Sequence, residues 1–251
     1  MSRWAYLDHP GPIPFAHRGG ASEHPENTMP AFEHAVRLGY RYLETDVHAT
    51  ADGVPVAFHD GALDRVTDLS GIIAQLPWET VRQARVGGTA GIPLMEELFT
   101  TWPEVRVNID LKHDASVVPL VDVIERTAAQ DRVCVASFSG KRLDRFRALT
   151  AGRVCTAVGP MNIARLRAAG FGLPPGRFAG ACAQVPVRQG PLLILDRRFV
   201  DAAHRLGLPV HVWTIDDPVQ MDHLLDLGVD GIMTDRPSVL KEVLVRRGGW
   251  A

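Results

Sequence analysis

The sequence predicts a (β/α)8 barrel, an α/β fold in which eight parallel strands alternate with eight helices. Two observations carry this prediction: a joint between helix and strand that recurs along the chain, and eight strand-like segments in order. The 251 residues match the length of about 250 that such a barrel often uses as one domain.

The recurring joint is a helical run, then Leu-Gly, then a short apolar segment that ends at Thr-Asp or Thr-Ile-Asp. It occurs at residues 37–46, 205–216 and 226–235. Glycine readily takes the left-handed conformation that ends a helix, and the apolar segment after it is typical of a buried strand. The repeated order of helix, glycine and strand indicates an α/β fold.

Apolar segments and capping residues place the individual elements. Asn27 or Thr28 suits the start of the first helix, and Asp217 followed by Pro218 suits a later one. The expected strands are 13–17, 42–46, 105–112, 133–138, 154–158, 180–185, 210–215 and 231–234. Further helices are expected near 93–101, 115–129, 140–149, 161–169 and 197–206, and after Pro237.

A ninth strand-like run, residues 54–59, needs a separate explanation. Only residues 50–53 separate it from the second strand, whereas a parallel crossover needs roughly a dozen residues or more. Asp52-Gly53 is a turn signal. We therefore expect an antiparallel hairpin over residues 42–59 that projects from the barrel mouth.

The register of this hairpin decides where His59 lies. If Ala49 pairs with Val54, His59 falls opposite Glu44. Residues 60–92 contain turn residues and one short apolar run, so we expect a small insertion at the barrel mouth. The predicted organisation is one domain over residues 1–251 with this single insertion.

Composition and charge exclude several classes of protein. Apolar residues make up 46% and charged residues 22% of the chain, which argues against disorder. With 27 Lys and Arg against 29 Asp and Glu the net charge is −2, and no basic run suggests a nucleic-acid partner. No apolar segment approaches the ~20 residues of a membrane helix, and residues 1–14 show no signal-peptide core. We expect a cytoplasmic protein with no integral membrane segment.

The cysteines predict no covalent or metal framework. Cys134, Cys155 and Cys182 are an odd number at wide spacing, and each lies in an apolar strand-like segment. Buried free thiols explain this pattern better than a disulfide or a zinc site.

Polar residues at spacing two mark the strand ends, where barrel enzymes place their active sites. Glu44 and Asp46 share one face of the second expected strand, and Asp110 and Lys112 share one face of the third. On a half-exposed strand such residues would simply face solvent. Strands of a parallel barrel are covered on both faces, so inward carboxylates must be paired or bind a metal. Three carboxylates suit Mg²⁺ or Ca²⁺ better than zinc.

Cationic, imidazole and aromatic side chains near the same strand ends extend this candidate site. Arg18 and Lys112 suit an anion such as phosphate, although each would also serve in an ion pair with a nearby carboxylate. His17 and His59 suit proton transfer near neutral pH. Trp213 is either a packed core residue or an apolar wall for a substrate, and its bulk favours the barrel mouth.

Several short motifs follow one another in a specific order. They are His17-Arg18-Gly19-Gly20, Pro25-Glu26-Asn27-Thr28, Glu44-Thr45-Asp46-Val47, Phe58-His59-Asp60, Leu63-Asp64-Arg65 with Thr67, Asn108-Ile109-Asp110-Leu111-Lys112, Val212-Trp213-Thr214 and Thr234-Asp235-Arg236-Pro237. Together, over roughly residues 13–240, they resemble the glycerophosphodiester phosphodiesterase family. Any one motif alone would be weak evidence.

The resemblance implies a (β/α)8 barrel with a small insertion after the second strand, and one divalent cation as cofactor. The implied roles are cation ligands for Glu44, Asp46 and Asp110, a general acid/base pair for His17 and His59, phosphodiester binding for Arg18 and Lys112, and a substrate wall for Trp213. Two positions depart from the family pattern. Asp110 stands where Glu is usual, and Asp216 stands where Asn is frequent.

The implied reaction is metal-dependent hydrolysis of a glycerophosphodiester, a small-molecule substrate, to sn-glycerol 3-phosphate and an alcohol. The attacking group is either water or a neighbouring glycerol hydroxyl. Two alternatives stay open. A lysophospholipase D-type enzyme would need an apolar channel, which residues 60–92 do not suggest, and a catalytically silent phosphate-binding barrel would not need the histidine pair.

Overall fold

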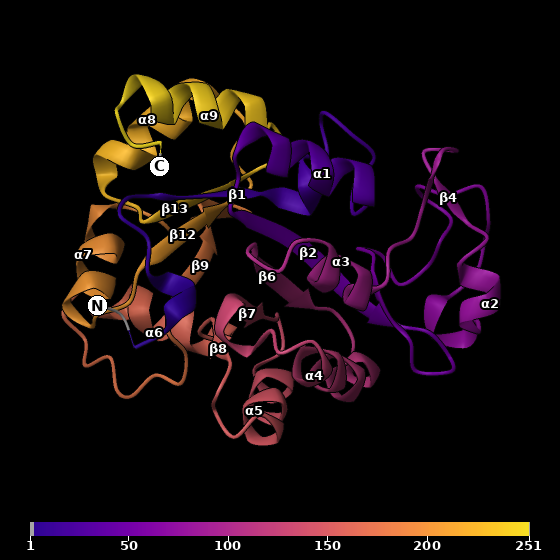
Figure 1. Cartoon of the computed structure of the whole chain (residues 1–251). Helices are drawn as coiled ribbons and strands as arrows, with labels where there is room; N and C mark the ends of the chain where they lie inside the picture. Colours follow the sequence, from indigo (N-terminus) through magenta and orange to yellow (C-terminus); the bar gives the residue numbers. More distant parts are fainter. Residues whose placement is uncertain (1–2, 251) are drawn as a thin grey trace.

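Eight parallel strands curl around the centre of the computed structural model, which describes residues 3–250 (Figure 1). Their order around the sheet is β8-β7-β6-β2-β1-β13-β12-β9. The strands are β1 (Ile13–Ala16), β2 (Tyr42–Ala49), β6 (Arg106–Leu111), β7 (Val133–Ala136), β8 (Cys155–Thr156), β9 (Ala183–Pro186), β12 (Val210–Trp213) and β13 (Gly231–Thr234). The eight predicted strand positions are therefore confirmed, although β8 is shorter and β9 begins later than expected.

Helices follow the strands in alternation and cover the outside of the sheet (Figure 1). They are α1 (Met29–Leu38), α3 (Met95–Thr101), α4 (Val117–Arg126), α5 (Gly140–Leu149), α6 (Pro160–Ala169), α7 (Arg197–Arg205), α8 (Pro218–Leu227) and α9 (Pro237–Arg246). Short 3-10 turns lie at Ala5–Leu7, His17–Gly19, Ile73–Gln75, Asp114–Ser116 and Gln130–Arg132. No helix within residues 3–250 is both long and apolar enough to cross a bilayer.

The predicted helix signals act as expected. The Thr28 side chain accepts a hydrogen bond from the backbone N–H of Ala31, and Asp217 does the same for Gln220. Gly39 ends α1 with φ 100° and Gly228 ends α8 with φ 92°, which is the left-handed conformation that glycine adopts without strain.

The barrel closes at a seam between β8 and β9. Here the two strands meet through one parallel bridge, between Ala157 and Cys182, instead of a long ladder. The interior beside the seam is packed with Phe15, Tyr42 and the three cysteines. All three thiols are free and buried, as predicted, and the sulfurs of Cys134 and Cys182 lie 3.9 Å apart.

The hairpin after β2 is present, but its predicted register is wrong by one residue. Strand β3 (Pro55–Ala57) pairs with β2 so that Ala49 faces Pro55, not Val54. The reason lies in the turn, where the Thr50 hydroxyl accepts a hydrogen bond from the backbone N–H of Val54 at 2.9 Å. That bond draws Val54 into the turn and shifts the ladder by one position.

The segment 60–92 has more internal structure than its sequence suggested. It holds α2 (Trp78–Val81) and a two-stranded ribbon of β4 (Arg85–Val86) and β5 (Ala90–Gly91). A separate core of buried side chains supports it, made of Val56, Phe58, Leu63, Ile73, Val81, Ala84, Val86 and Ile92. A further hairpin, β10 (Arg188–Gln189) with β11 (Leu192–Leu193), lies between β9 and α7.

Candidate active site

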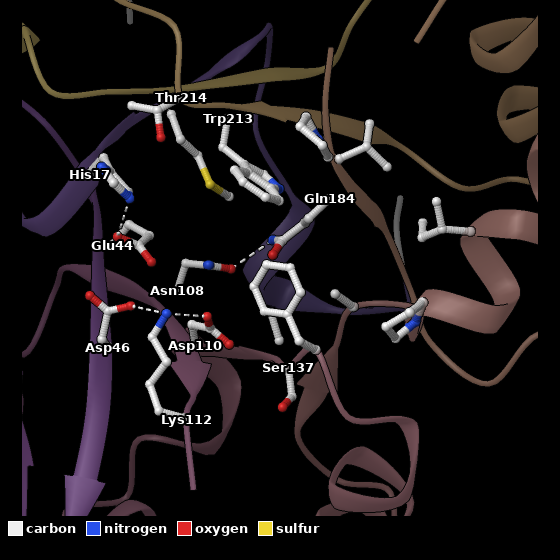
Figure 2. A pocket seen from close by; sticks show the side chains of 18 of the residues that line it. His17, Glu44, Asp46, Asn108, Asp110, Lys112, Ser137, Gln184, Trp213 and Thr214 are labelled. Atoms are coloured by element: carbon white, nitrogen blue, oxygen red, sulfur yellow. Dashed lines mark hydrogen bonds and ion pairs between the residues drawn. The ribbon is translucent and has the colours of Figure 1, made fainter. Parts of the chain in front are cut away.

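A pocket of about 260 Å³ opens at the carboxyl ends of the barrel strands (Figure 2). Every residue predicted for the site lines it: His17, Arg18, Glu44, Asp46, His59, Asp110, Lys112 and Trp213. The structure therefore brings together side chains that lie up to 196 positions apart in the sequence.

The turn after β1 places two of these residues. Arg18 has φ 51°, and Gly19 and Gly20 also lie in the left-handed region. A Cβ at Gly19 would come within 2.7 Å of Ala31, and one at Gly20 within 2.7 Å of Pro237. Only glycines fit these positions, and the resulting tight turn directs the backbone N–H of Arg18 to Glu44 Oε2 at 3.1 Å.

The carboxylates come from two neighbouring strands in register. Asp46 on β2 faces Asp110 on β6, and Glu44 faces Asn108. All four side chains are buried. The Lys112 ammonium lies between the two aspartates, 2.9 Å from Asp46 Oδ1 and 2.7 Å from Asp110 Oδ2 (Figure 2).

Burial and neighbouring charge separate the pKa values of these groups. Burial raises the pKa of Glu44 to about 7, despite the nearby His17. Burial also raises the pKa of Asp110. Asp46 behaves in the opposite way, because Lys112 and Arg18 overcome its burial and lower its pKa.

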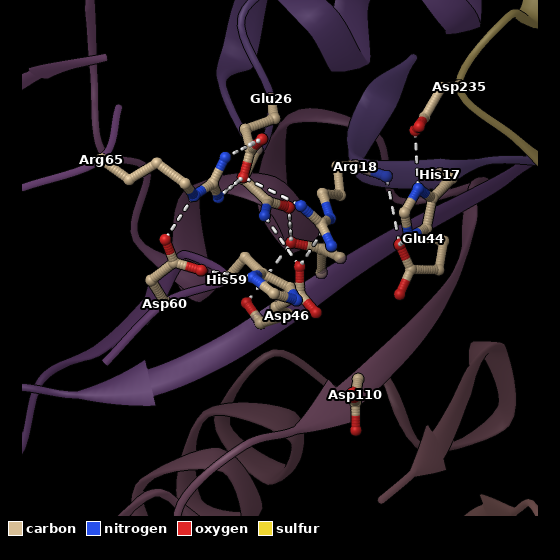
Figure 3. Close-up of polar contacts among 12 residues, drawn as sticks. His17, Arg18, Glu26, Glu44, Asp46, His59, Asp60, Arg65, Asp110 and Asp235 are labelled. Carbon is tan, nitrogen blue, oxygen red and sulfur yellow. Dashed lines mark hydrogen bonds and ion pairs between the residues drawn. The ribbon is translucent and has the colours of Figure 1, made fainter. Parts of the chain in front are cut away.

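His17 is held between two carboxylates (Figure 3). Its Nδ1 lies 2.6 Å from Asp235 Oδ1, and its Nε2 lies 3.7 Å from Glu44 Oε2. Burial alone would lower the pKa of His17, but Glu44 and the hydrogen bond to Asp235 raise it. Asp235 directly follows β13, and its backbone N–H donates to Asp216 Oδ1 at 2.8 Å.

His59 is held by a chain of charged residues that runs through Asp60, Arg65 and Glu26 back to Arg18 at the pocket (Figure 3). Its Nδ1 lies 2.5 Å from Asp60 Oδ1, and Asp60 also accepts a hydrogen bond from Arg65. Arg65 in turn donates to Glu26, which also accepts from Arg18 at 3.1 Å. Although partial burial would raise the pKa of Asp60, its hydrogen bonds with Arg65 and His59 lower it to about 2.

The other side of the pocket is apolar. Trp213 stands at the barrel mouth, with its ring centroid 5.8 Å from that of Phe138 in an edge-to-face arrangement. Val158, Ile163 and Ile194 line the same side. Trp213 therefore lies at the barrel mouth, as predicted. The pocket also has an apolar surface, and the residues that form it lie outside residues 60–92, where none was expected.

Sequence reasoning missed several residues that hold the site together. Asn27 donates to Asp46 Oδ2 at 2.9 Å, and Gln184 donates to Asn108 at 2.7 Å. Asp60 and Asp235 each bind a histidine of the pocket. The sequence did hold a signal for each, because Asp60 directly follows His59 and Asp235 directly follows a predicted strand. Nothing in the sequence showed which side chains the two aspartates would meet.

Two histidines near the predicted mouth do not line the pocket. His48 is buried, and its Nε2 lies 3.1 Å from the backbone oxygen of His59, so it supports the position of that residue. The ring of His24 contacts that of His34 at a tilt of 48°, with 4.4 Å between the ring centroids.

Comparison with known proteins agrees with this geometry. The model of the glycerophosphoryl diester phosphodiesterase family matches residues 17–239. The probable glycerophosphodiester phosphodiesterase 2 of Mycobacterium tuberculosis is 42% identical over 98% of this chain and 95% of its own length. The lysophospholipase D GDPD1 of Rattus norvegicus is 27% identical over 91% of this chain and 85% of its own.

Solved structures share the fold. A protein of Silicibacter pomeroyi, provisionally named a glycerophosphoryl diester phosphodiesterase, superposes with a TM-score of 0.84 at 24% identity over 99% of this chain and 100% of its own. An Oleispira antarctica phosphodiesterase in complex with the product sn-glycerol-3-phosphate gives a TM-score of 0.79 at 23% identity over 94% and 97%. The fold is the TIM barrel of these proteins, and this chain belongs to the glycerophosphoryl diester phosphodiesterase family.

Proposed function

We propose that this protein hydrolyses glycerophosphodiesters to sn-glycerol 3-phosphate and an alcohol, with the help of a divalent cation. The observation that carries the proposal is the pair His17 and His59 in one pocket, each bound through Nδ1 to an aspartate. Family membership and a structural neighbour bound to sn-glycerol-3-phosphate support the same reaction.

The two histidines suit general acid and base catalysis. When the Nδ1–H group donates a hydrogen bond to a carboxylate, Nε2 is free to accept or release a proton. One histidine would take the proton of the attacking hydroxyl or water, and the other would protonate the leaving alkoxide. Such transfers contribute about 10²–10⁴-fold each.

Arg18 and Lys112 would bind the phosphodiester anion. Both line the pocket and lie next to Asp46, at 3.4 Å and 2.9 Å. The Asp46 carboxylate therefore holds both cations beside the space where the substrate would lie. An arginine fork and a lysine point charge are the usual partners of phosphate oxygens.

Glu44, Asp46 and Asp110 would hold the cation, Mg²⁺ or Ca²⁺. Within residues 3–250 no three His, Cys, Asp or Glu side chains form a ready-made metal-binding group, since Lys112 separates Asp46 from Asp110. The donor chemistry still fits, because Asp110 Oδ1 is buried with no hydrogen-bond partner among the described residues and three carboxylates favour a hard cation. When bound, the cation would stabilise charge on the phosphoryl oxygens.

The test is turnover of glycerophosphocholine with and without EDTA, followed by Mg²⁺, Ca²⁺ and Mn²⁺ in parallel. We expect turnover that EDTA abolishes and that one of the three cations restores. Turnover that EDTA leaves unchanged would refute the cation. No turnover across a panel of diesters would instead favour a silent phosphate-binding barrel. A cyclic phosphate seen by phosphorus NMR would identify the glycerol hydroxyl as the nucleophile.

The apolar side of the pocket favours a second candidate, a lysophospholipase D-type activity. Phe138, Ile163, Ile194 and Trp213 offer a surface for an apolar group on the substrate. Changing Trp213 to Ala should reduce kcat/KM for a lysophospholipid more than for glycerophosphocholine, by roughly tenfold. Equal losses for both substrates would remove this candidate.

A further inference from the structure

Positive charge is concentrated in about a quarter of the chain. Residues 132–198 contain 12 Lys and Arg, two Asp and no Glu, while the remaining residues contain 15 Lys and Arg against 27 Asp and Glu. The net charge of −2 therefore hides a strongly basic segment within an acidic protein. The basic residues are dispersed, so no run of them marks the segment in the sequence.

The same segment exposes large apolar side chains beside the pocket. Phe138, Met161, Leu192 and Leu193, which we call the apolar rim, are 65%, 68%, 58% and 36% exposed. They lie on the three successive connections that follow β7, β8 and β9: Phe138 in a loop, Met161 in the first turn of α6, and Leu192 and Leu193 on β11. Their neighbours Pro160, Gln189 and Ile194 line the pocket, so the apolar rim borders the pocket mouth.

A cation accompanies each part of the apolar rim. Lys141 follows Phe138 by three residues, Arg165 follows Met161 by four residues on α6, and Arg188 pairs with Leu193 in the β10–β11 hairpin. All three cations are exposed. Within residues 3–250 none of the three has an ion-pair partner, unlike Arg142, Arg147, Arg153 and Arg167 of the same segment.

We propose that the apolar rim and its three cations dock this face of the barrel onto an anionic lipid bilayer. Exposed aliphatic and aromatic side chains next to Lys and Arg are typical of surfaces that enter the headgroup region. Each cation near an anionic surface strengthens binding roughly fivefold. A nucleic acid would match the charge, but the rim offers it a single aromatic ring for base stacking and three aliphatic side chains that bases cannot stack on.

Docking in this orientation would place the pocket mouth against the lipid. A substrate with an apolar group could then pass from the bilayer along the apolar rim to the side of the pocket lined by Ile194 and Trp213. Exposed apolar side chains and cations that are unpaired among the described residues define this surface, so its binding to lipid does not depend on the proposed reaction.

Co-sedimentation of the full chain with vesicles tests the surface. We expect binding to vesicles of phosphatidylcholine mixed with phosphatidylglycerol, weak binding to phosphatidylcholine alone, and a decrease as salt rises. Failure to bind the mixed vesicles would overturn the proposal. So would binding to single-stranded RNA at protein concentrations that give no vesicle binding.

Two variants and a matched control locate the contact. Met161→Glu with Leu192→Glu should weaken vesicle binding at least tenfold, and Lys141→Glu with Arg188→Glu should do the same on anionic vesicles only. Val245→Glu on α9 changes a side chain that is 55% exposed and should bind as the wild type does. Equal losses in all three would overturn the proposal.

Turnover of water-soluble glycerophosphocholine separates docking from catalysis. None of the substituted side chains lines the pocket, so all three variants should retain wild-type turnover. A docking variant that loses this turnover together with vesicle binding would show a damaged fold and overturn the assignment of the surface. Vesicle binding by a chain without any turnover would leave the surface intact and refute only the proposed reaction.

Discussion

The two histidines of the pocket are held by different parts of the molecule. His17 directly follows β1 and is fixed by Asp235, which directly follows the neighbouring barrel strand β13. His59 follows the hairpin and is fixed by Asp60 and Arg65, which belong to the insertion. The side chain of His17 is 14% exposed and that of His59 is 32% exposed.

The barrel therefore holds one of the two proposed proton-transfer groups, and the insertion holds the other. The insertion has its own core of buried side chains, so loosening that core should leave the barrel folded while the site is incomplete. We expect the position of His59 to depend on the folding of residues 60–92, because Asp60 and Arg65, which hold His59, belong to that segment. The predictions below test this division, from the largest effect to the smallest.

Replacing either histidine should have the largest effect. His17→Ala and His59→Ala should each lower kcat for glycerophosphocholine by about 10²–10⁴-fold, since a proton-transfer group is lost. The control is His113→Ala, whose ring does not line the pocket and whose loss should change kcat little. Near-full turnover in either pocket variant would refute the acid/base assignment.

Replacing the supporting aspartates should have a smaller effect. Asp235→Asn and Asp60→Asn should lower kcat by about tenfold or more and leave KM nearly unchanged, because the histidine remains but its orientation and basicity change. A matched rise in KM with constant kcat would contradict this role. The pH profile of kcat should also shift in both variants, which a purely structural change would not produce.

Loosening the insertion should affect only one histidine. Ile73→Ala removes a fully buried side chain from the insertion core and should cost about 2–5 kcal/mol in the stability of that region. Hydrogen exchange should accelerate in residues 60–92 and not in the barrel strands, and kcat should fall less than in the histidine variants. Equal acceleration throughout the barrel would show that the two parts unfold together.

The smallest expected effect is a pH-dependent loss of stability in Asp60→Asn. The folded state lowers the pKa of Asp60 to about 2, so the carboxylate stabilises the fold above its unfolded pKa of about 3.9. This contribution, about 1 kcal/mol after solvent screening, should disappear as the pH falls from 4 to 2. Urea titrations of both proteins over this range should therefore converge at the acid end.

Local patterns were enough to predict the barrel and most of the pocket lining. The helix–glycine–strand joint marked three strands, and spacing of two residues placed Asp46 and Asp110 on inward faces. These patterns could not predict the register of the hairpin, because it depends on a hydrogen bond from the backbone N–H of Val54 to the Thr50 side chain. The prediction of one domain over residues 1–251 stays a prediction, as do the individual catalytic roles.

Contacts between distant segments could not be predicted. Asp235 meets His17 across 218 positions and Gln184 meets Asn108 across 76, and no local pattern encodes such pairs. Scattered apolar residues concealed the insertion core, and dispersed arginines concealed the basic segment. The insertion core becomes visible only when the fold brings its members together, and only the fold brings the cations of the basic segment that are unpaired within residues 3–250 to the apolar rim.

The buried cysteines lie at or near the seam between β8 and β9, so their reaction with a thiol reagent can report when these strands separate. Cys155 and Cys182 lie on the two sides of this joint, and Cys134 lies one strand away. A thiol reagent reaches them only when the surrounding strands separate. If the thiols are labelled faster than the whole protein unfolds, the barrel opens first at the seam between β8 and β9. The labelling rate then gives the free energy of this local opening.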